Sequence, residues 1–171
     1  MSEDISHYRL EAPIGVGMFA TVHRGEDRRF GGPVAVKILA ENHSLDGDLR
    51  QRFLGEAHLL RRMRSPHIVQ FFDLGETKNR QPYLVVELCE GGTLAQRMRD
   101  RGTERVTSRD ALVLIDSLCD GLAEMHRHRV VHRDLTPANV LIDSAHRSGE
   151  GDFFDPDERL VISDLGLSKD L

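Results

Sequence analysis

The decisive stretch of the chain is His132-Arg133-Asp134-Leu135-Thr136-Pro137-Ala138-Asn139. Asp134 can accept a proton from a substrate hydroxyl, and the later Asn139 can turn back to offer its amide oxygen to a Mg²⁺ ion. One short loop would then hold a base and a metal ligand near the same phosphate group. Alone, the spacing H-x-D-x-x-x-x-N is moderately specific, and the alternative is a charged surface loop that ends in an asparagine turn.

Length and composition describe an ordinary water-soluble chain. Its 171 residues can form one core or two small lobes, with 39% hydrophobic and 30% charged residues. A net charge of -5 gives no reason to expect nucleic acid or an anionic membrane as the main partner. No apolar run approaches a membrane span, and the first residues lack signal-peptide features. Cys89 and Cys119 are expected to be buried free thiols in a reducing compartment, so we expect a cytoplasmic location.

The first half of the chain alternates β-type runs with turns and contains one amphipathic helix. Strands are expected at residues 8–14, 20–25, 34–39, 68–74 and 82–88. The helix is expected at 48–63, where one apolar stripe recurs at helical spacing: Leu49, Phe53, Ala57, Leu60 and Met63. Glu90-Gly91-Gly92 is typical of a linker between two lobes.

The second half is expected to be mainly helical, with helices at 93–100 and 108–127. Thr107 and Asp110 resemble a capping box at the start of the longer one. Its apolar stripe is Leu112, Ile115, Leu118, Leu122 and Met125. Short strands are expected at 140–142 and 159–163. Between them, we expect 143–158 to be a solvated acidic loop, with acidic residues Glu150, Asp152, Asp155, Asp157 and Glu158. A calcium loop is the alternative, but the ligand spacing does not match an EF-hand.

A glycine-containing turn separates the first two expected strands. Gly15 and Gly17 would let the backbone approach phosphates closely, because neither carries a Cβ. The third position of the G-x-G-x-x-G pattern is Ala20, and an ordinary hairpin turn is an equally good interpretation of this motif alone. A dinucleotide-binding turn is disfavoured, because that motif needs a helix directly after the glycines and 21–24 has the pattern of a strand.

Lys37 stands in the middle of the apolar strand 34–39, where an unpaired ammonium group would be costly. Glu56 lies on the apolar face of the next helix, between Phe53 and Leu60. We therefore expect the two side chains to meet. The pair could aim the lysine at nucleotide phosphates, or it could be a purely structural salt bridge.

Ser163-Asp164-Leu165-Gly166 follows the apolar strand residues 160–162. An aspartate at a strand end, before a turn glycine, suits a metal ligand. The motif is common by itself, and it gains value because it follows the loop 132–139 in the chain.

Taken in order, Gly15/Gly17, Lys37, Glu56, Asp134, Asn139 and Asp164 carry a resemblance to a known family. From Tyr8 to its last residue the chain resembles the eukaryotic-type (Hanks-type) serine/threonine protein kinases, in a bacterial style. The resemblance implies an α+β, two-lobed fold. Residues 1–89 would form a β-rich N-lobe with one long helix, and 90–171 the hinge and the first part of a mainly helical C-lobe.

The resemblance also implies ATP and Mg²⁺ as cofactors and a protein substrate. Asp134 would be the catalytic base, Lys37 would pair with Glu56, and Asn139 and Asp164 would bind Mg²⁺. The residues implied to bind the nucleotide are Ile14, Gly15, Gly17, Val22, Ala35, Lys37, Val86, Glu87, Cys89 and Leu141. An internal spine joining the lobes would consist of Leu60, Phe71, His132 and Leu165.

The chain departs from the family pattern at four places. Ala20 replaces the third glycine, and Leu165 replaces the usual phenylalanine but stays apolar. Thr136 stands where serine/threonine kinases usually carry a lysine, which removes a positive charge near the γ-phosphate. Pro137 still favours serine/threonine over tyrosine specificity. The segment 143–158 lengthens a connection that is usually a tight hairpin.

The family continues beyond the motif at Asp164 with an activation segment and further helices. We therefore expect a piece of a longer kinase, with part of the stripe on helix 108–127 uncovered. Two other functions remain open. One is a small-molecule phosphotransferase of the aminoglycoside-kinase type, against which Arg133 and the lysine strand argue. The other is an inactive nucleotide-binding or interaction module.

Overall fold

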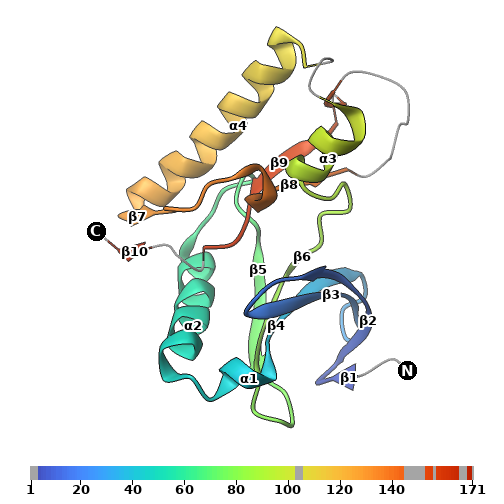
Figure 1. The fold of residues 1–171 in the computed structure, drawn as a ribbon, viewed down its shortest axis with the longest axis vertical. Helices are drawn as coiled ribbons and strands as arrows, with labels where there is room; N and C mark the ends of the chain where they lie inside the picture. Colours follow the sequence, from blue (N-terminus) through green and yellow to red (C-terminus); the bar gives the residue numbers. More distant parts are fainter. Residues whose placement is uncertain (1–3, 103–105, 145–152, 156, 166–168, 171) are drawn as a thin grey trace. The chain divides into compact units, whose positions relative to one another are not determined.

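The computed structural model describes residues 4–102, 106–144, 153–155, 157–165 and 169–170, and it combines helices and strands as an α+β fold, as expected (Figure 1). The chain divides into two compact units. The first comprises Met1–Arg61 and Gln70–Leu88, and the second comprises Arg62–Val69 and Cys89–Leu171.

The first unit is built on one antiparallel sheet of six strands in the order β1-β2-β3-β4-β6-β5. Its strands are β1 (Asp4–Ile5), β2 (Tyr8–Val16), β3 (Ala20–Asp27), β4 (Pro33–Leu39), β5 (Phe71–Glu76) and β6 (Pro82–Glu87). All strands predicted for this region are present, although β5 begins three residues later than expected. The two-residue strand β1 has too short a pattern to predict.

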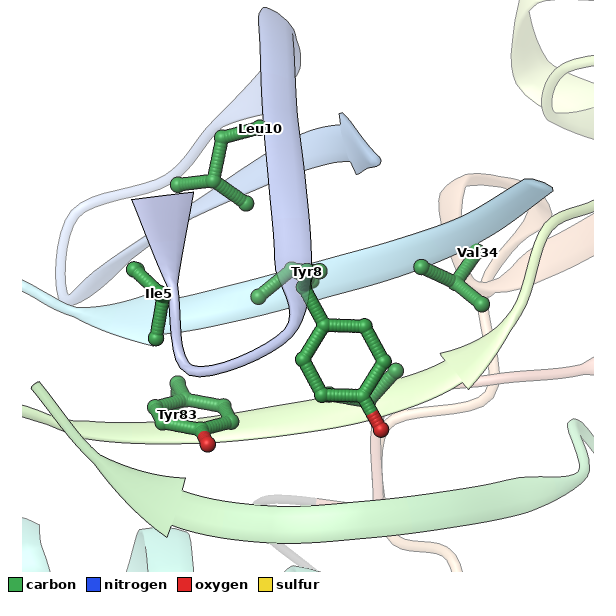
Figure 2. Packing of buried hydrophobic residues seen from close by; sticks show 7 residues of the cluster. Ile5, Tyr8, Leu10, Val34 and Tyr83 are labelled. Carbon is green, nitrogen blue, oxygen red and sulfur yellow. The ribbon is translucent and has the colours of Figure 1, made fainter. Parts of the chain in front are cut away.

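One face of this sheet carries a hydrophobic cluster, shown in Figure 2. The cluster consists of Ile5, Tyr8, Leu10, Val34, Val36, Tyr83 and Val85. Because side chains alternate along a strand, Ala35 and Lys37 of β4 point to the opposite face. The rings of Tyr8 and Tyr83 meet edge to face, with centroids 6.4 Å apart.

The sheet curls so that strands distant in its order meet. The hydroxyl of Tyr8 on β2 donates a hydrogen bond to Asp73 on β5, at 3.1 Å, although three strands lie between them. Burial, together with the neighbouring Asp73 carboxylate, raises the pKa of Tyr8 above its ordinary value. The phenol therefore stays neutral and able to donate this bond.

The helix α2 (Gly47–Arg62) forms where the apolar stripe was predicted. Phe53, Glu56, Ala57 and Leu60 are its buried residues, as the helical spacing required. A short helix that was not predicted, α1 (Glu41–Ser44), connects β4 to α2.

The second unit contains the helices α3 (Leu94–Arg101) and α4 (Ser108–Arg127) and the 3₁₀ turn η1 (Pro137–Asn139). Its strands pair as two short antiparallel ladders, β8 (Val140–Asp143) with β9 (Arg159–Ile162) and β7 (Val130–Val131) with β10 (Lys169–Asp170) (Figure 1). The predicted capping box is present, since Thr107 and the Asp110 side chain cap each other's backbone at the start of α4.

Residues 62–69 belong to this unit because they run beside β9. The amide of Val69 donates to the carbonyl of Ile162, and Ile162 donates to the carbonyl of His67. Helix α4 packs closely on the same strand at Gly121. A Cβ there would lie 2.7 Å from a side-chain atom of Ile162 and 2.9 Å from the His67 carbonyl oxygen.

The apolar stripe of α4 is only partly covered. Met125 is fully buried, whereas Leu112 and Ile115 are 60% and 54% exposed, as expected. The prediction that both cysteines are buried was wrong. Cys119 is exposed, because it follows Leu112 and Ile115 on the outward side of the helix, and Cys89 is half-buried.

The expectation of a solvated loop at 143–158 was wrong for its end, while Glu150 and Asp152 lie outside the described residues. Phe153 and Phe154 are buried and pack edge to face in the core of the second unit. Glu158 accepts two hydrogen bonds from the guanidinium of Arg97 on α3, at 2.7 and 3.0 Å. The acidic composition of the segment predicted a solvated Glu158. Its carboxylate is instead paired with Arg97, which anchors the segment to α3.

Two buried carboxylates fix the ends of α4. At the start, Asp110 accepts from the amide of Phe154, so it ties segment 153–158 to the helix. At the end, Glu124 accepts from the amide of Arg64 at 2.8 Å. That backbone bond, helped by Arg127 and His128, holds the pKa of Glu124 below its ordinary value.

Among the described residues, none of the helices has both the length and the apolar composition of a membrane span.

Candidate active site

The candidate residues of the first unit centre on the pair of Lys37 and Glu56. The ammonium nitrogen of Lys37 lies 3.0 and 2.9 Å from the two carboxylate oxygens of Glu56. The glutamate side chain is 4% exposed and that of the lysine 18%, so water screens the pair little. The ring of Phe53 lies 6.0 Å from the ammonium group and completes its surroundings. The predicted meeting of lysine and glutamate is therefore present.

The strand register brings further candidate residues to the same face of the sheet as Lys37. Val22 of β3 lies opposite Lys37, and Val86 of β6 lies opposite Ala35. Residues opposite each other in an antiparallel pair project to one side, so these side chains share the face away from the cluster in Figure 2. Val22, Ala35 and Val86 thus form an apolar patch beside the ammonium group.

The glycine-containing turn joins β2 to β3, and β3 pairs with the strand of Lys37. Gly15 lies opposite Val22, and the amide of Gly17 donates to the carbonyl of Ala20 at 2.9 Å. A Cβ on Gly17 would approach that carbonyl oxygen to 3.3 Å, which is a tight contact. Ile14, at the end of the same strand, is 51% exposed and available for a ligand. The turn is a hairpin and is not followed by a helix.

Of the nucleotide-binding candidates around the end of β6, Glu87 lies in the first unit and Cys89 in the second. Glu87 ends β6, where its amide donates to the carbonyl of Gln70 and its carboxylate accepts from the amide of Gln70. Leu141 lies on β8 in the second unit and forms an isolated bridge with Thr93.

The candidate residues of the second unit begin with the loop 132–139. Pro137 begins the 3₁₀ turn η1, a position where its missing N–H costs nothing. The turn carries Asn139 back to Asp134, so that the asparagine amide nitrogen donates to the backbone oxygen at 2.8 Å and to the carboxylate at 3.1 Å. The amide oxygen of Asn139 then remains as a possible metal ligand. Asp134 itself is exposed.

His132 fastens this loop to the end of β9. Its ring is 2% exposed, with Nε2 3.0 Å from the carbonyl oxygen of Ser163 and Nδ1 3.3 Å from the amide of Asp134. The backbone N–H of Asp134 can donate only to an unprotonated Nδ1 of His132. The ring proton therefore lies on Nε2, which donates to the carbonyl oxygen of Ser163. Ser163 in turn donates from its amide and its hydroxyl to the carbonyl of Asn139, at 2.9 and 3.1 Å.

Because Asp164 directly follows Ser163, these hydrogen bonds connect its backbone to the loop 132–139. Sequence reasoning gave His132 only a packing role and missed Ser163. A polar residue between an apolar strand and an aspartate was the only available signal.

Backbone strain is concentrated at two of these positions. Arg133 has φ of 66° and Asp164 has φ of 58°, the left-handed region that side chains other than glycine rarely adopt. Such conformations cost roughly 1–3 kcal/mol each and persist where the surroundings enforce them. Here the neighbours His132 and Ser163 supply the bonds that do so. Leu165, which follows, is buried, so it packs as expected in place of phenylalanine.

Within the described residues, no cluster of three or more histidine, cysteine, aspartate or glutamate side chains could hold a metal ion. A carboxylate with an amide oxygen is instead the sparse, oxygen-only ligand set that Mg²⁺ uses when phosphates complete its coordination. The lysine–glutamate pair and the glycine turn lie in the first unit, and the aspartate–asparagine loop lies in the second. These residue types are typical of phosphoryl-transfer enzymes.

Comparison with known proteins agrees with this class. A family model described as protein kinase domain matches residues 8–171. The serine/threonine-protein kinase PknL of Mycobacterium tuberculosis is 36% identical over 95% of this chain and 37% of its own length. Human serine/threonine-protein kinase H2 is 32% identical over 96% of this chain and 39% of its own length. The chain thus spans less than two fifths of these curated relatives.

Among solved structures, the kinase domain of Mycobacterium tuberculosis PknI has a TM-score of 0.76 and 25% sequence identity. The match covers 96% of this chain and 62% of that domain. The chain belongs to the protein kinase family.

Proposed function

We propose that this chain is the catalytic region of an ATP-dependent serine/threonine protein kinase. The observation that carries the proposal is the hydrogen-bonded frame of the second unit. In it, Asn139 bonds Asp134, and Ser163 joins both to the strand end at Asp164. A charged surface loop would not require a buried histidine to fasten it. Serine/threonine kinases among the relatives support the substrate class.

In this proposal most of the nucleotide-binding residues belong to the first unit, and Cys89 and Leu141 belong to the second. Lys37, aimed by Glu56, contacts the α- and β-phosphates, and the turn at Gly15 and Gly17 covers them. Val22 and Ala35 hold the adenine ring. The remaining nucleotide contacts are assigned to Ile14, Val86, Glu87, Cys89 and Leu141. The spine of Leu60, Phe71, His132 and Leu165 stays a prediction, because its members divide between the two units.

Asp134 is the base of the proposed reaction. The substrate hydroxyl oxygen forms a bond to the γ-phosphorus, its proton passes to the Asp134 carboxylate, and the bond to ADP breaks. The amide of Asn139 fixes the rotamer of that carboxylate at its Oδ2 oxygen, which leaves Oδ1 to receive the proton. Exposure of Asp134 gives a protein substrate access to it.

Asn139 and Asp164 fit a Mg²⁺ ion. The amide nitrogen of Asn139 is engaged by Asp134, so its oxygen is the atom left to bind a cation. Bound Mg²⁺ supplies neutralisation of the charge on the phosphate oxygens. Thr136 brings no such charge, which predicts slower transfer than in relatives with lysine there. A cytoplasmic location belongs to the same proposal.

The test is a substrate panel with ATP labelled at the γ-phosphate. Label is expected on serine or threonine of a protein, with Mg²⁺ required and Lys37→Met inactive. Label on an aminoglycoside instead would favour the small-molecule alternative. Binding of ATP without any transfer, even to the chain itself, would favour the inactive module.

A further inference from the structure

The turn at the candidate phosphate site makes a side-chain contact outside the sheet. The ring of Phe19, at the tip of the turn, lies edge to face against the ring of His43, with centroids 5.2 Å apart and planes at 68°. His43 lies on α1, the short helix between the strand of Lys37 and the helix of Glu56 (Figure 1). This is a favourable geometry for a ring pair.

The two residues at the tip of the turn differ in solvent exposure, and the ring contact of Phe19 explains the difference. Met18 is 81% exposed, whereas Phe19, its neighbour, is 45% exposed. The backbone joins the same two segments, since the amide of Ala40 donates to the carbonyl of Phe19 at 2.8 Å. That bond extends the ladder of β3 and β4 one step past Ala20 and Leu39. Phe19 is thus held by both its backbone and its ring.

The partner segment is itself ordered by local bonds. The amide of His43 donates to the carbonyl of Ala40 at 2.9 Å, and the hydroxyl of Ser44 donates to the carbonyl of Glu41 at 2.7 Å. These hydrogen bonds order the backbone that carries the ring of His43. A glycine-rich hairpin has little else to restrict it, because its glycines carry no side chains to pack.

We propose that His43 is a positioning residue for the nucleotide: its ring holds Phe19, and so holds the glycine turn in the position that receives the phosphates. The inference rests on the proposed function, since it assigns the turn to ATP. A ring pair of this kind changes an equilibrium by a factor of about three to ten. Loss of the contact lets the free turn sample other positions, and ATP binding must then restore order at a corresponding loss of affinity.

The first experiment measures the Kd of Mg²⁺–ATP by calorimetry for the intact chain. His43→Ala and Phe19→Ala should each weaken binding about three- to tenfold. The double variant should bind Mg²⁺–ATP no more weakly than the single variant of lower affinity, because both changes remove the same ring contact. His43→Phe, which keeps a ring, should recover most of the affinity. Phe30→Ala is the matched control, since Phe30 is 83% exposed and belongs to another turn of the same unit.

The second experiment observes the turn directly and needs no nucleotide. The chain contains no tryptophan, so Met18→Trp places one reporter at the exposed tip. Time-resolved fluorescence anisotropy of this variant should show faster local motion when His43→Ala is added, and slower motion again with His43→Phe. The melting temperature, followed by circular dichroism, should change little in all three, because the pair lies on the surface.

The outcomes separate the two proposals. If the unaltered chain fails to bind Mg²⁺–ATP, the proposed function is contradicted. If it binds, but His43→Ala binds equally well and leaves the anisotropy unchanged, the positioning role of His43 is contradicted. Additive losses in the double variant would also contradict it, because the two residues would then act independently.

Discussion

The ammonium group of Lys37 bonds both carboxylate oxygens of Glu56, a side chain that is almost wholly buried. A buried ion pair is costly to assemble, and apolar residues of similar size are often as stable. We therefore interpret its presence on the face that carries Val22 and Ala35 as a ligand-binding feature rather than a stabilising one.

Stability and activity should separate in variants of this pair. Lys37→Met leaves a buried carboxylate without its cation and should lower the free energy of unfolding by about 3 kcal/mol. The double variant Lys37→Met/Glu56→Leu should recover most of that loss in urea denaturation, yet both should lack phosphotransfer and bind Mg²⁺–ATP weakly. Equal nucleotide affinity in the double variant and the unaltered chain would show that the pair is purely structural.

Segment 153–158 should behave as part of the core. Phe154→Ala removes a buried ring and should cost about 3–5 kcal/mol in the free energy of unfolding. Asp157→Ala, at an exposed position of the same segment, should cost less than about 0.5 kcal/mol. Similar small effects at both positions, measured by urea denaturation, would mean that the segment is a solvated loop after all.

Glu124 should contribute a pH-dependent part of the stability. Its pKa in the folded chain lies below the ordinary value of 4.5, because the amide of Arg64 and then Arg127 and His128 favour the carboxylate. The contribution is therefore present above pH 4.5 and is lost as the pH falls through the lowered pKa. Glu124→Gln keeps an acceptor for the Arg64 amide but removes the charge. It should be about 1 kcal/mol less stable at pH 6, and the difference should shrink below pH 4.5.

The exposed Asp116 on the same helix supplies the control for this prediction. Asp116→Asn should differ little from the unaltered chain over the whole range in pH-dependent urea denaturation. A constant difference between Glu124→Gln and the unaltered chain, from pH 6 to the acid limit of folding, would count against the assignment.

Periodicity and position made much of this structure predictable. The helical spacing around Phe53 placed Glu56 inward, and the cost of an unpaired lysine then required a partner for Lys37. The capping box of Thr107 and Asp110 marked the start of α4 because the two side chains satisfy adjacent amides. Each of these predictions needs only neighbours in sequence or one apolar face.

Features that depend on distant partners could not be predicted. Phe153 and Phe154 are apolar, but the acidic residues around them favoured a solvated loop, and the partners Arg97 and Asp110 that anchor their segment lie far away in sequence. The left-handed backbone at Arg133 and Asp164 is likewise enforced by bonds between separate segments. The exposure of Cys119 depends on which side of α4 meets β9, and Gly121 decides that by allowing the closest approach.

The most direct test of the central claim is transfer of labelled γ-phosphate from Mg²⁺–ATP to protein serine or threonine. The unaltered chain is compared with Asp134→Asn at matched ATP occupancy. Phosphoserine or phosphothreonine is expected with the unaltered chain. A rate at least about a hundredfold lower is expected for Asp134→Asn, with the Kd of ATP nearly unchanged, because the variant loses the base and keeps the nucleotide contacts. Equal rates in the two proteins, or ATP binding without transfer in either, would contradict the claim.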